Sequence, residues 1–291
     1  MRIVILGAGG RLGAALAREY ATDFEVRGYK HADVDLANLD RLRDLLRTLE
    51  FDLLINAAAL TNVDYCETHR DEALLINAEA PRILAELCHE KNAKLIQIST
   101  DYVFDGKARV PYREEDEAIP LSVYGESKRE GELSVLGSSG RHLVARISWV
   151  FGPDRPSFVD HIIQRARQTT QVAAVADKFS TPTYTLDLAR WLRAAWKSDL
   201  SGLLHLANHG ECSWQQYAQY AIDCCHHHGI PLQASCVAEL KLSDMKNFIA
   251  LRPVYTVLAT ATFTRQTGVE PRNWREAVAE YIETHVIKHE D

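Results

Sequence analysis

Hydrophobic residues in the first half of the chain follow two alternating patterns. Short, mostly apolar runs are typical of buried strands, and longer stretches with an apolar residue every three or four positions are typical of helices packed on a sheet. The short runs predict strands over residues 2–6, 25–29, 52–56, 94–99 and 142–147. The longer stretches predict helices over residues 11–20, 39–49, 71–91 and 124–133.

Strands that alternate with helices favour a parallel sheet, because each parallel strand needs a crossover connection before the next. We therefore expect an α/β protein with a Rossmann-type, doubly wound parallel sheet, formed by a first domain over residues 1–150. After this point prolines interrupt a looser pattern, with helices predicted over residues 186–197, 213–227 and 274–285. Residues 151–291 are expected to form mainly a smaller substrate lobe, with about 183–207 returning to the first domain.

Composition and charge narrow the class of protein. The chain has 291 residues, 25% of them charged, and a formal net charge of −7. An acidic protein is poorly suited to nucleic acid or anionic membranes, so we expect neither as a partner. The apolar start ends at Gly7, and no run reaches the roughly 18–20 residues that span a bilayer. We expect a cytoplasmic monomer or homodimer.

The six cysteines show no CxxC spacing and no framework of a small disulfide-rich domain, so free thiols are expected. The run CCHHH at residues 224–228 contains metal-ligating residue types. It lies at the end of a predicted helix, where adjacent side chains point in different directions. We interpret the run as a helix end and expect no metal.

A glycine-rich segment, GAGGRLG at residues 7–13, joins the first strand to the first helix. Gly7, Gly10 and Gly13 allow a tight turn, let the backbone approach a pyrophosphate and let the helix pack closely on the sheet. The helix N-terminus directs N–H groups and the positive end of its dipole at the phosphates. This strand–turn–helix context predicts a dinucleotide cofactor.

The end of the second strand bears on the choice of cofactor. An acidic residue there would favour NAD, and this chain has Lys30 instead. Lys30, together with Arg11, either pairs with the 2′-phosphate of NADPH or is a solvated loop charge. Asp35, before Leu36, either accepts a hydrogen bond from adenine or belongs to the N-cap of the next helix. We expect NADPH, with NADH as the alternative.

Three polar residues predict the chemistry. Tyr124 and Lys128 are four residues apart on a predicted helix and therefore share a face. A phenol has a pKa of about 10, and a nearby ammonium lowers it and so helps proton exchange near neutral pH. Thr100, at the end of the fourth strand, is placed to hydrogen-bond the reacting oxygen. Together with the glycine loop, these residues predict hydride transfer between a nicotinamide and a carbonyl.

Further motifs extend over almost the whole chain. They are NAAALTNVD at 56–64, STDYVFDG at 99–106, YGESK at 124–128, RISWVFG at 146–152, PT at 182–183, DLA at 187–189 and RP at 252–253. With the glycine loop, these segments resemble the dTDP-4-dehydrorhamnose reductases of the extended short-chain dehydrogenase/reductase superfamily. The resemblance implies reduction, by NADPH or NADH, of the C4 ketone of a dTDP-linked 6-deoxy sugar.

The resemblance also implies a role for individual residues. Tyr124 would donate the proton, Lys128 would assist it and hold the nicotinamide ribose, and Thr100 would orient the reacting oxygen. The substrate would contact Thr100, Asp101, Trp149 and Arg252. The cofactor would contact Gly10, Arg11, Leu12, Asp35, Leu36, Ala59 and Leu60, with Thr61 near the nicotinamide. A place in the hydrophobic core is the alternative for Trp149.

Four positions depart from the common pattern of these reductases. Ala15 replaces a glutamate with which some bacterial members dimerise through a metal, so neither feature is carried over. Lys178, in DKFS at 177–180, replaces the glutamine of a more usual Asp-Gln-x-Gly. VYT at 254–256 replaces x-Asn-Ser, and residues 153–157 are rich in proline. These positions are in or beside the predicted substrate lobe or interface, so they bear on sugar identity more than on chemistry.

Other functions stay open from the sequence. The dehydratases of the same superfamily carry Asp-Glu after the active-site threonine, whereas Thr100 is followed by Asp101 and Tyr102. This difference argues against dehydration but leaves a reductase or epimerase of a GDP- or UDP-linked sugar. A non-catalytic NADP-binding subunit similar to the β subunit of methionine adenosyltransferase is an alternative from another class. The intact Tyr124 and Lys128 favour an enzyme.

Overall fold

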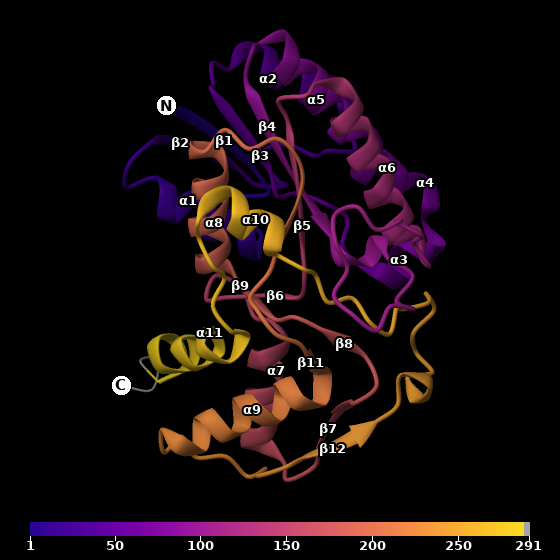
Figure 1. The fold of residues 1–291 in the computed structure, drawn as a ribbon, viewed down its shortest axis with the longest axis vertical. Helices are drawn as coiled ribbons and strands as arrows, with labels where there is room; N and C mark the ends of the chain where they lie inside the picture. The colour runs from indigo at the N-terminus through magenta and orange to yellow at the C-terminus, as the bar shows by residue number, and fades with distance from the viewer. Residues whose placement is uncertain (288–291) are drawn as a thin grey trace.

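A six-stranded parallel sheet forms the centre of the larger part of the molecule (Figure 1). The computed structural model describes residues 1–287. The strands are β1 (Arg2–Leu6), β2 (Glu25–Tyr29), β3 (Leu53–Asn56), β4 (Lys94–Thr100), β5 (Leu143–Ile147) and β10 (Gly202–Leu206). Their order is β10-β5-β4-β3-β1-β2, so the winding reverses between β1 and β3. Ligands of open α/β sheets bind at such a reversal, beyond the carboxyl ends of the strands.

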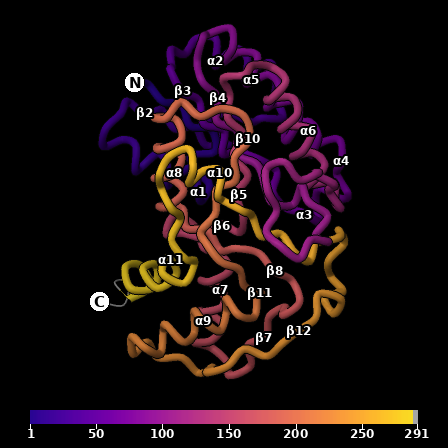
Figure 2. Tube along the Cα trace, viewed as in Figure 1, coloured from indigo at the N-terminus to yellow at the C-terminus, as the bar shows by residue number. Residues whose placement is uncertain are grey.

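Helices cover both faces of this sheet, as expected for a doubly wound fold. On one face are α1 (Arg11–Tyr20), α8 (Thr185–Lys197) and α10 (Ala261–Thr267). On the other face are α2 (Leu39–Thr48), α5 (Ala80–Glu90) and α6 (Val123–Ser138). Figure 2 shows the two groups of helices on either side of the strands.

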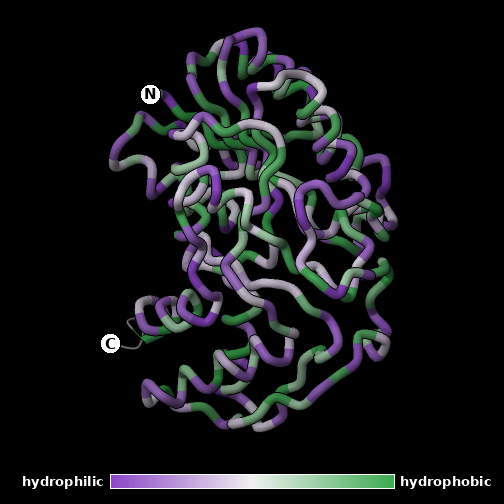
Figure 3. The backbone as a smooth tube through the Cα atoms, in the orientation of Figure 1, coloured by the Kyte–Doolittle hydropathy of each residue, from purple (hydrophilic) through white to green (hydrophobic). Residues whose placement is uncertain are grey.

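The strand β1 shows why its sequence is apolar without alternation. Ile3 and Ile5 pack in the core beneath α1 and α8, while Val4 and Leu6 pack in the core beneath α2 and α5. Successive side chains of a strand point to opposite faces, and here both faces are buried. The strands at the centre of Figure 3 are accordingly hydrophobic along their length.

The predicted helix over residues 71–91 is present but is not uniform. It comprises α4 (Arg70–Leu74), a π-helical turn (Leu75–Glu79) and α5, and it follows a short helix, α3 (Val63–Thr68), that the hydrophobic pattern did not predict. Pro81 explains the irregular turn, because it has no N–H to donate to the carbonyl of Asn77 four residues earlier.

The smaller part of the molecule lies below the sheet in Figure 1 and contains α7 (Phe158–Gln168), α9 (Trp214–His227) and α11 (Trp274–Tyr281). A second π-helical turn (Ile282–Val286) follows α11. The short strands of the smaller part of the molecule form three pairs: β7 (Val172–Val175) with β12 (Val237–Leu240), β8 (Phe179–Ser180) with β11 (Cys212–Ser213), and β6 (Val150–Phe151) with β9 (Thr183–Tyr184). Short 3₁₀ turns cover Asp101–Val103 and Leu242–Asp244.

Two segments from the second half of the chain pack with the first half. The strand β10 pairs with β5, and α8 packs on α1. Both elements lie within residues 183–207, the segment predicted to pack with the first domain. The helix α10 also packs on α8 and β10, which the sequence pattern did not indicate. The division into two domains near residue 150 stays a prediction. No helix within residues 1–287 has the length and apolar character to span a membrane.

Candidate active site

The glycine loop lies between β1 and α1, and two of its glycines are required by the fold. Gly7 has a φ of +81° and donates its N–H to the carbonyl of Tyr29 at 2.9 Å. A Cβ atom on Gly13 would lie 2.1 Å from the carbonyl oxygen of Gly7. At Gly10 a Cβ would contact only that oxygen, at 3.2 Å. Gly10 therefore leaves backbone accessible at the N-terminus of α1, which fits a pyrophosphate.

The two cations predicted to read a 2′-phosphate are placed differently. The aliphatic part of Lys30 lies beside Gly9, where a Cβ would be 3.3 Å from its Cγ. Within residues 1–287 the Lys30 ammonium makes no hydrogen bond or ion pair, so it is available to an anion. The Arg11 guanidinium instead donates to the carbonyls of Val150 and Arg155 at 3.3 and 3.2 Å. The Arg11 side chain is thus hydrogen-bonded to β6 and to the segment that follows it.

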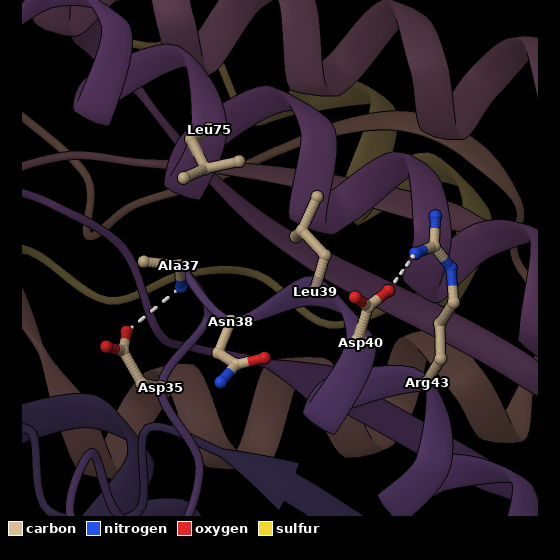
Figure 4. Close-up of a pocket in the computed structure, with 7 residues that line it drawn as sticks. All are labelled: Asp35, Ala37, Asn38, Leu39, Asp40, Arg43 and Leu75. Carbon is tan, nitrogen blue, oxygen red and sulfur yellow. Dashed lines mark hydrogen bonds and ion pairs between the residues drawn. The ribbon is translucent and has the colours of Figure 1, made fainter.

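A hollow of about 510 Å³ lies beside Asp35 and is lined by residues of α2 and by Leu75 of the π-helical turn (Figure 4). Asp35 Oδ1 accepts the N–H of Ala37 at 2.9 Å. Leu36 is buried in the core, so its side chain faces away from solvent. Asn38, and not Asp35, caps α2, because its side chain accepts the N–H of Arg41. Asp35, which is predicted to meet the adenine, therefore lines a hollow, and its contact with the cofactor stays a prediction.

A buried asparagine that the sequence analysis missed holds the segment of Ala59, Leu60 and Thr61. The side chain of Asn77 accepts the N–H of Leu60 at 2.9 Å and donates to its carbonyl at 3.0 Å. The same amide donates to Ser127 Oγ at 3.0 Å. The loop after β3 is therefore tied to α6, the helix that carries Tyr124 and Lys128. In the sequence, only Pro81 indicates that the helix is irregular at Asn77, because a proline cannot donate a hydrogen bond to the carbonyl four residues earlier.

Tyr124 lies in the first turn of α6, whose N-cap is Ser122. The next residue, Gly125, allows close approach, because a Cβ there would lie 2.2 Å from the carbonyl oxygen of Tyr102. The Tyr124 phenol lies near enough to Thr100 for the Thr100 hydroxyl to act on its pKa, and Thr100 Oγ1 donates to Asp101 Oδ1 at 3.2 Å. The structure therefore brings the predicted acid and the predicted oxygen-orienting hydroxyl together.

The sequence-based expectation that the Tyr124 pKa is lowered is wrong for this structure. Burial raises the pKa of Tyr124 well above its ordinary value of 10, and the nearby Thr100 hydroxyl opposes this effect only in part. Burial disfavours the charged phenolate. The phenol therefore keeps its proton at neutral pH, which is the form required of a proton donor.

Lys128 is buried on the same helix and donates from Nζ to the carbonyl of Ile98 in β4 at 2.7 Å. Burial lowers its pKa to about 8, and the charge of Glu132 opposes that shift. Glu132 is four residues further along the same face of α6, a spacing from which the sequence could have indicated it. It accepts hydrogen bonds from Ser99 at 2.6 Å and from Arg146 at 2.8 and 2.7 Å.

Asp101 is buried between β4 and the segment that follows β5. Its Oδ2 accepts the hydroxyl of Ser148 at 2.9 Å, and Thr256 also hydrogen-bonds the carboxylate. Burial raises the Asp101 pKa, while the nearby Lys178 lowers it. Neither Ser148 nor Lys178 was assigned a role from the sequence, because nothing in local spacing connects them with Asp101.

Trp149 follows Ser148 and has a φ of +38°, an unusual conformation for a bulky residue. Its half-buried ring packs edge-on against Tyr217, with the ring centres 4.8 Å apart, and also contacts Phe158 and Trp214. The aromatic packing and the partial exposure are compatible with both roles considered for Trp149. Its contact with the sugar stays a prediction.

Arg252, predicted to contact the substrate, forms an ion pair with Asp64. Its Nη2 lies 2.6 Å from Asp64 Oδ2, its Nη1 lies 3.0 Å from Oδ1, and its guanidinium stacks 3.6 Å from the ring centre of Phe248. The Arg252 guanidinium holds the Asp64 pKa well below its usual range. Asp64 also accepts the N–H groups of Ile249 and Ala250. The contact of Arg252 with substrate stays a prediction.

Within residues 1–287, no group of three or more histidine, cysteine or acidic side chains is placed to hold a metal ion. The sheet, the glycine loop and the Tyr124–Thr100 pair on neighbouring elements instead define an NAD(P)-dependent oxidoreductase of the short-chain dehydrogenase/reductase type.

The chain belongs to the family described as "RmlD substrate binding domain", whose model matches residues 1–287. The dTDP-4-dehydrorhamnose reductase of Escherichia coli is 34% identical, over 96% of each chain. A probable dTDP-4,6-dihydroxy-2-methyloxan-3-one 4-ketoreductase of Streptomyces antibioticus is 36% identical, over 96% of this chain and 94% of the relative. These matches confirm the resemblance inferred from the motifs.

Solved structures agree with the sequence comparisons. A dTDP-4-dehydrorhamnose reductase from Clostridium acetobutylicum superposes with a TM-score of 0.91 at 33% identity, over 99% of this chain and 100% of its own. The enzyme of the same name from Bacillus anthracis, in complex with NADP, gives a TM-score of 0.90 at 29% identity, over 97% and 99%. The predicted Rossmann-type fold is thereby confirmed.

Proposed function

We propose that this protein uses NADPH to reduce the C4 ketone of a dTDP-linked 4-keto-6-deoxy sugar, namely dTDP-4-dehydrorhamnose, to give dTDP-rhamnose. The observation that carries the proposal is the buried Tyr124 phenol, which lies near Thr100 at the end of β4 and one helical turn from the buried Lys128 on α6. A hydroxyl that stays protonated at neutral pH suits reduction, in which a proton must be delivered to an oxygen. The named relatives supply the substrate class.

The residues fit a bound dinucleotide. Gly10 leaves the N-terminus of α1 open to a pyrophosphate, and the hollow beside Asp35 offers a place for the adenosine end. Lys30 has a free ammonium near Gly9 and would pair with the 2′-phosphate that distinguishes NADPH from NADH. We assign contacts to the nicotinamide end to Ala59, Leu60 and Thr61.

NADPH, when bound, supplies the hydride that forms the new C–H bond at C4. As the C=O double bond becomes a single bond, negative charge develops on the C4 oxygen, and Tyr124 transfers its phenolic proton to that oxygen. The Thr100 hydroxyl, by turning its proton from Asp101 to the substrate, would donate a second hydrogen bond to the same oxygen, which stabilises the developing charge. Lys128, held on the backbone of β4, would favour the phenolate left on Tyr124. One hydride and one proton together convert the ketone to an alcohol.

The proposal is tested by the oxidation of NADPH in the presence of dTDP-, GDP- and UDP-linked 4-keto-6-deoxy sugars. We expect the highest kcat/KM with dTDP-4-dehydrorhamnose, and mass spectrometry should find a product heavier by two hydrogen atoms. Faster turnover of a GDP- or UDP-linked sugar would correct the nucleotide. An absence of NADPH oxidation with every sugar of the panel would reject the reductase function.

A further inference from the structure

A second buried lysine lies beside the site, and the mechanism above does not use it. Lys178 immediately precedes β8 and is 1% exposed. Its strand is fixed by backbone hydrogen bonds of Phe179 to Val254 and Thr256, at 2.7 and 2.9 Å. Thr256 in turn hydrogen-bonds Asp101, so Lys178 belongs to the segments that surround that carboxylate.

The ammonium of Lys178 has charged neighbours but no direct partner. It acts on Asp101 through its charge and lies 5.2 Å from the centre of the Tyr102 ring, and Arg252 adds a second cation nearby. Within residues 1–287 it makes neither a hydrogen bond nor an ion pair. Lys128, which is equally buried, donates to a backbone carbonyl at 2.7 Å. The Lys178 Nζ atom is not among the fully enclosed side-chain atoms that lack a partner, so the ammonium end of this otherwise buried side chain keeps a small accessible surface and is available to a ligand.

The position of Lys178 relative to the reaction follows from a chain of contacts. The Tyr124 phenol lies near Thr100, Thr100 Oγ1 donates to Asp101 Oδ1 at 3.2 Å, and Lys178 lies near enough to Asp101 for each charge to act on the other. The Lys178 ammonium is therefore separated by Asp101 from Tyr124 and Thr100, the two residues proposed to act on the C4 oxygen. In a 4-keto-6-deoxy sugar, C5 carries the methyl group and the ring oxygen, so the hydroxyl adjacent to C4 is the one on C3.

We propose that Lys178 is a specificity-determining residue that donates a hydrogen bond to the C3 hydroxyl of the sugar, while Asp101 accepts the proton of that same hydroxyl. A hydroxyl carries one donor and two acceptor lone pairs, which match a carboxylate and an ammonium placed together. The inference rests on the proposed reductase function and extends it to the pattern of sugar substituents. Glutamine at this position would supply a neutral donor instead.

The test compares the wild-type protein with Lys178→Met and Lys178→Gln on two substrates, dTDP-4-dehydrorhamnose and its 3-deoxy analogue. A hydrogen bond to a charged donor is expected to contribute about ten- to hundred-fold. We expect Lys178→Met to lower kcat/KM by that factor for the 3-hydroxy substrate only, and Lys178→Gln to lower it less. Lys197→Met, which removes an exposed lysine on α8, serves as the control for loss of one charge.

The preference between the two substrates should also depend on pH in the wild-type protein. Burial lowers the pKa of Lys178 to about 8, with Asp101 opposing and Arg252 reinforcing the shift. The preference for the 3-hydroxy substrate should therefore decrease from pH 7 to pH 9, and Lys178→Met should show no such decrease. Titration of Lys128 affects both substrates and cancels in the ratio.

Binding of dTDP-rhamnose, its 3-deoxy analogue and dTDP by titration calorimetry separates this inference from the reductase function, because it needs no turnover. We expect Lys178→Met to weaken dTDP-rhamnose alone. Equal weakening of all three ligands would place Lys178 at the diphosphate and overturn the proposal. Equal loss of kcat/KM on both substrates, or failure of the wild-type protein to bind either sugar nucleotide, would overturn it as well.

Discussion

At the scale of single residues, burial has opposite effects on the acid and on the two lysines of the site. Tyr124 is neutral when protonated, so burial raises its pKa and keeps its proton in place. Lys128 and Lys178 are charged when protonated, so burial lowers the pKa of each to about 8. The same burial therefore keeps Tyr124 protonated and brings the pKa of both lysines close to neutral pH.

Replacement of Tyr124 by phenylalanine keeps the ring and removes only the hydroxyl. General acid–base groups contribute about 10²–10⁴-fold, so kcat for the reduction should fall by that order. The affinity for NADPH, measured by isothermal titration, should remain within about two-fold of the wild-type value, since the fold of α6 is kept. Turnover close to wild type would remove Tyr124 from the mechanism.

Lys30→Ala tests the basis of the cofactor preference. A partly exposed ammonium paired with the 2′-phosphate should contribute about 1–2 kcal/mol, which corresponds to roughly ten-fold in preference. We therefore expect the ratio of kcat/KM for NADPH to that for NADH to fall about ten-fold. An unchanged ratio would show that the Lys30 charge is simply solvated.

At the scale of elements, both helices that face the site begin where a glycine permits close backbone approach. Gly13 lets α1 pack against the carbonyl of Gly7, and Gly125 lets α6 pack against the carbonyl of Tyr102. The π-helical turn adds a third device, because it presents Asn77 to the loop after β3. The elements thus hold the glycine loop, Tyr124 and the loop after β3 in fixed relation.

Gly10→Val separates cofactor binding from folding. Gly10 has an extended conformation, with φ of −88° and ψ of 171°, that valine adopts readily, and its Cβ would meet only the Gly7 oxygen. We expect Tm within about 2 °C of the wild-type value and NADPH affinity reduced at least ten-fold, because the side chain would occupy space needed by the pyrophosphate.

Gly13→Ala is the matched comparison, since its Cβ would clash with backbone at 2.1 Å and should destabilise the fold itself. If Gly10→Val bound NADPH as tightly as the wild-type protein, the glycine loop would not be the pyrophosphate site.

At the scale of the whole molecule, ion pairs and hydrogen bonds join segments that are far apart in the sequence. Asp64 and Arg252, 188 positions apart, attach the segment before Pro253 to the start of α3. Arg11 attaches the glycine loop to the segment after β5. Segments after residue 150 are therefore held to the first half of the chain through backbone carbonyls that accept from Arg11 and through ion pairs such as Asp64–Arg252.

Asp64→Asn should loosen the segment that Arg252 anchors. The amide keeps the size of the carboxylate but removes the charge, at a cost of about 1–2 kcal/mol, so Tm should fall by about 2–8 °C. We expect KM for the sugar nucleotide to rise while the Kd of NADPH stays constant. An equal change in both constants, measured by steady-state kinetics and calorimetry, would contradict a local role at the substrate side.

Local patterns in the sequence determined most of the elements, the glycine loop and the placement of Tyr124 and Lys128 on one helix, because each depends on spacing within one strand or helix. The helix α1 and the strand β2 begin and end at the predicted residues. Only the tertiary structure decided which groups share a buried environment. Asp101 and Lys178 come from distant segments, and the direction of the Tyr124 pKa shift depends on burial by neighbours that spacing along the chain does not reveal.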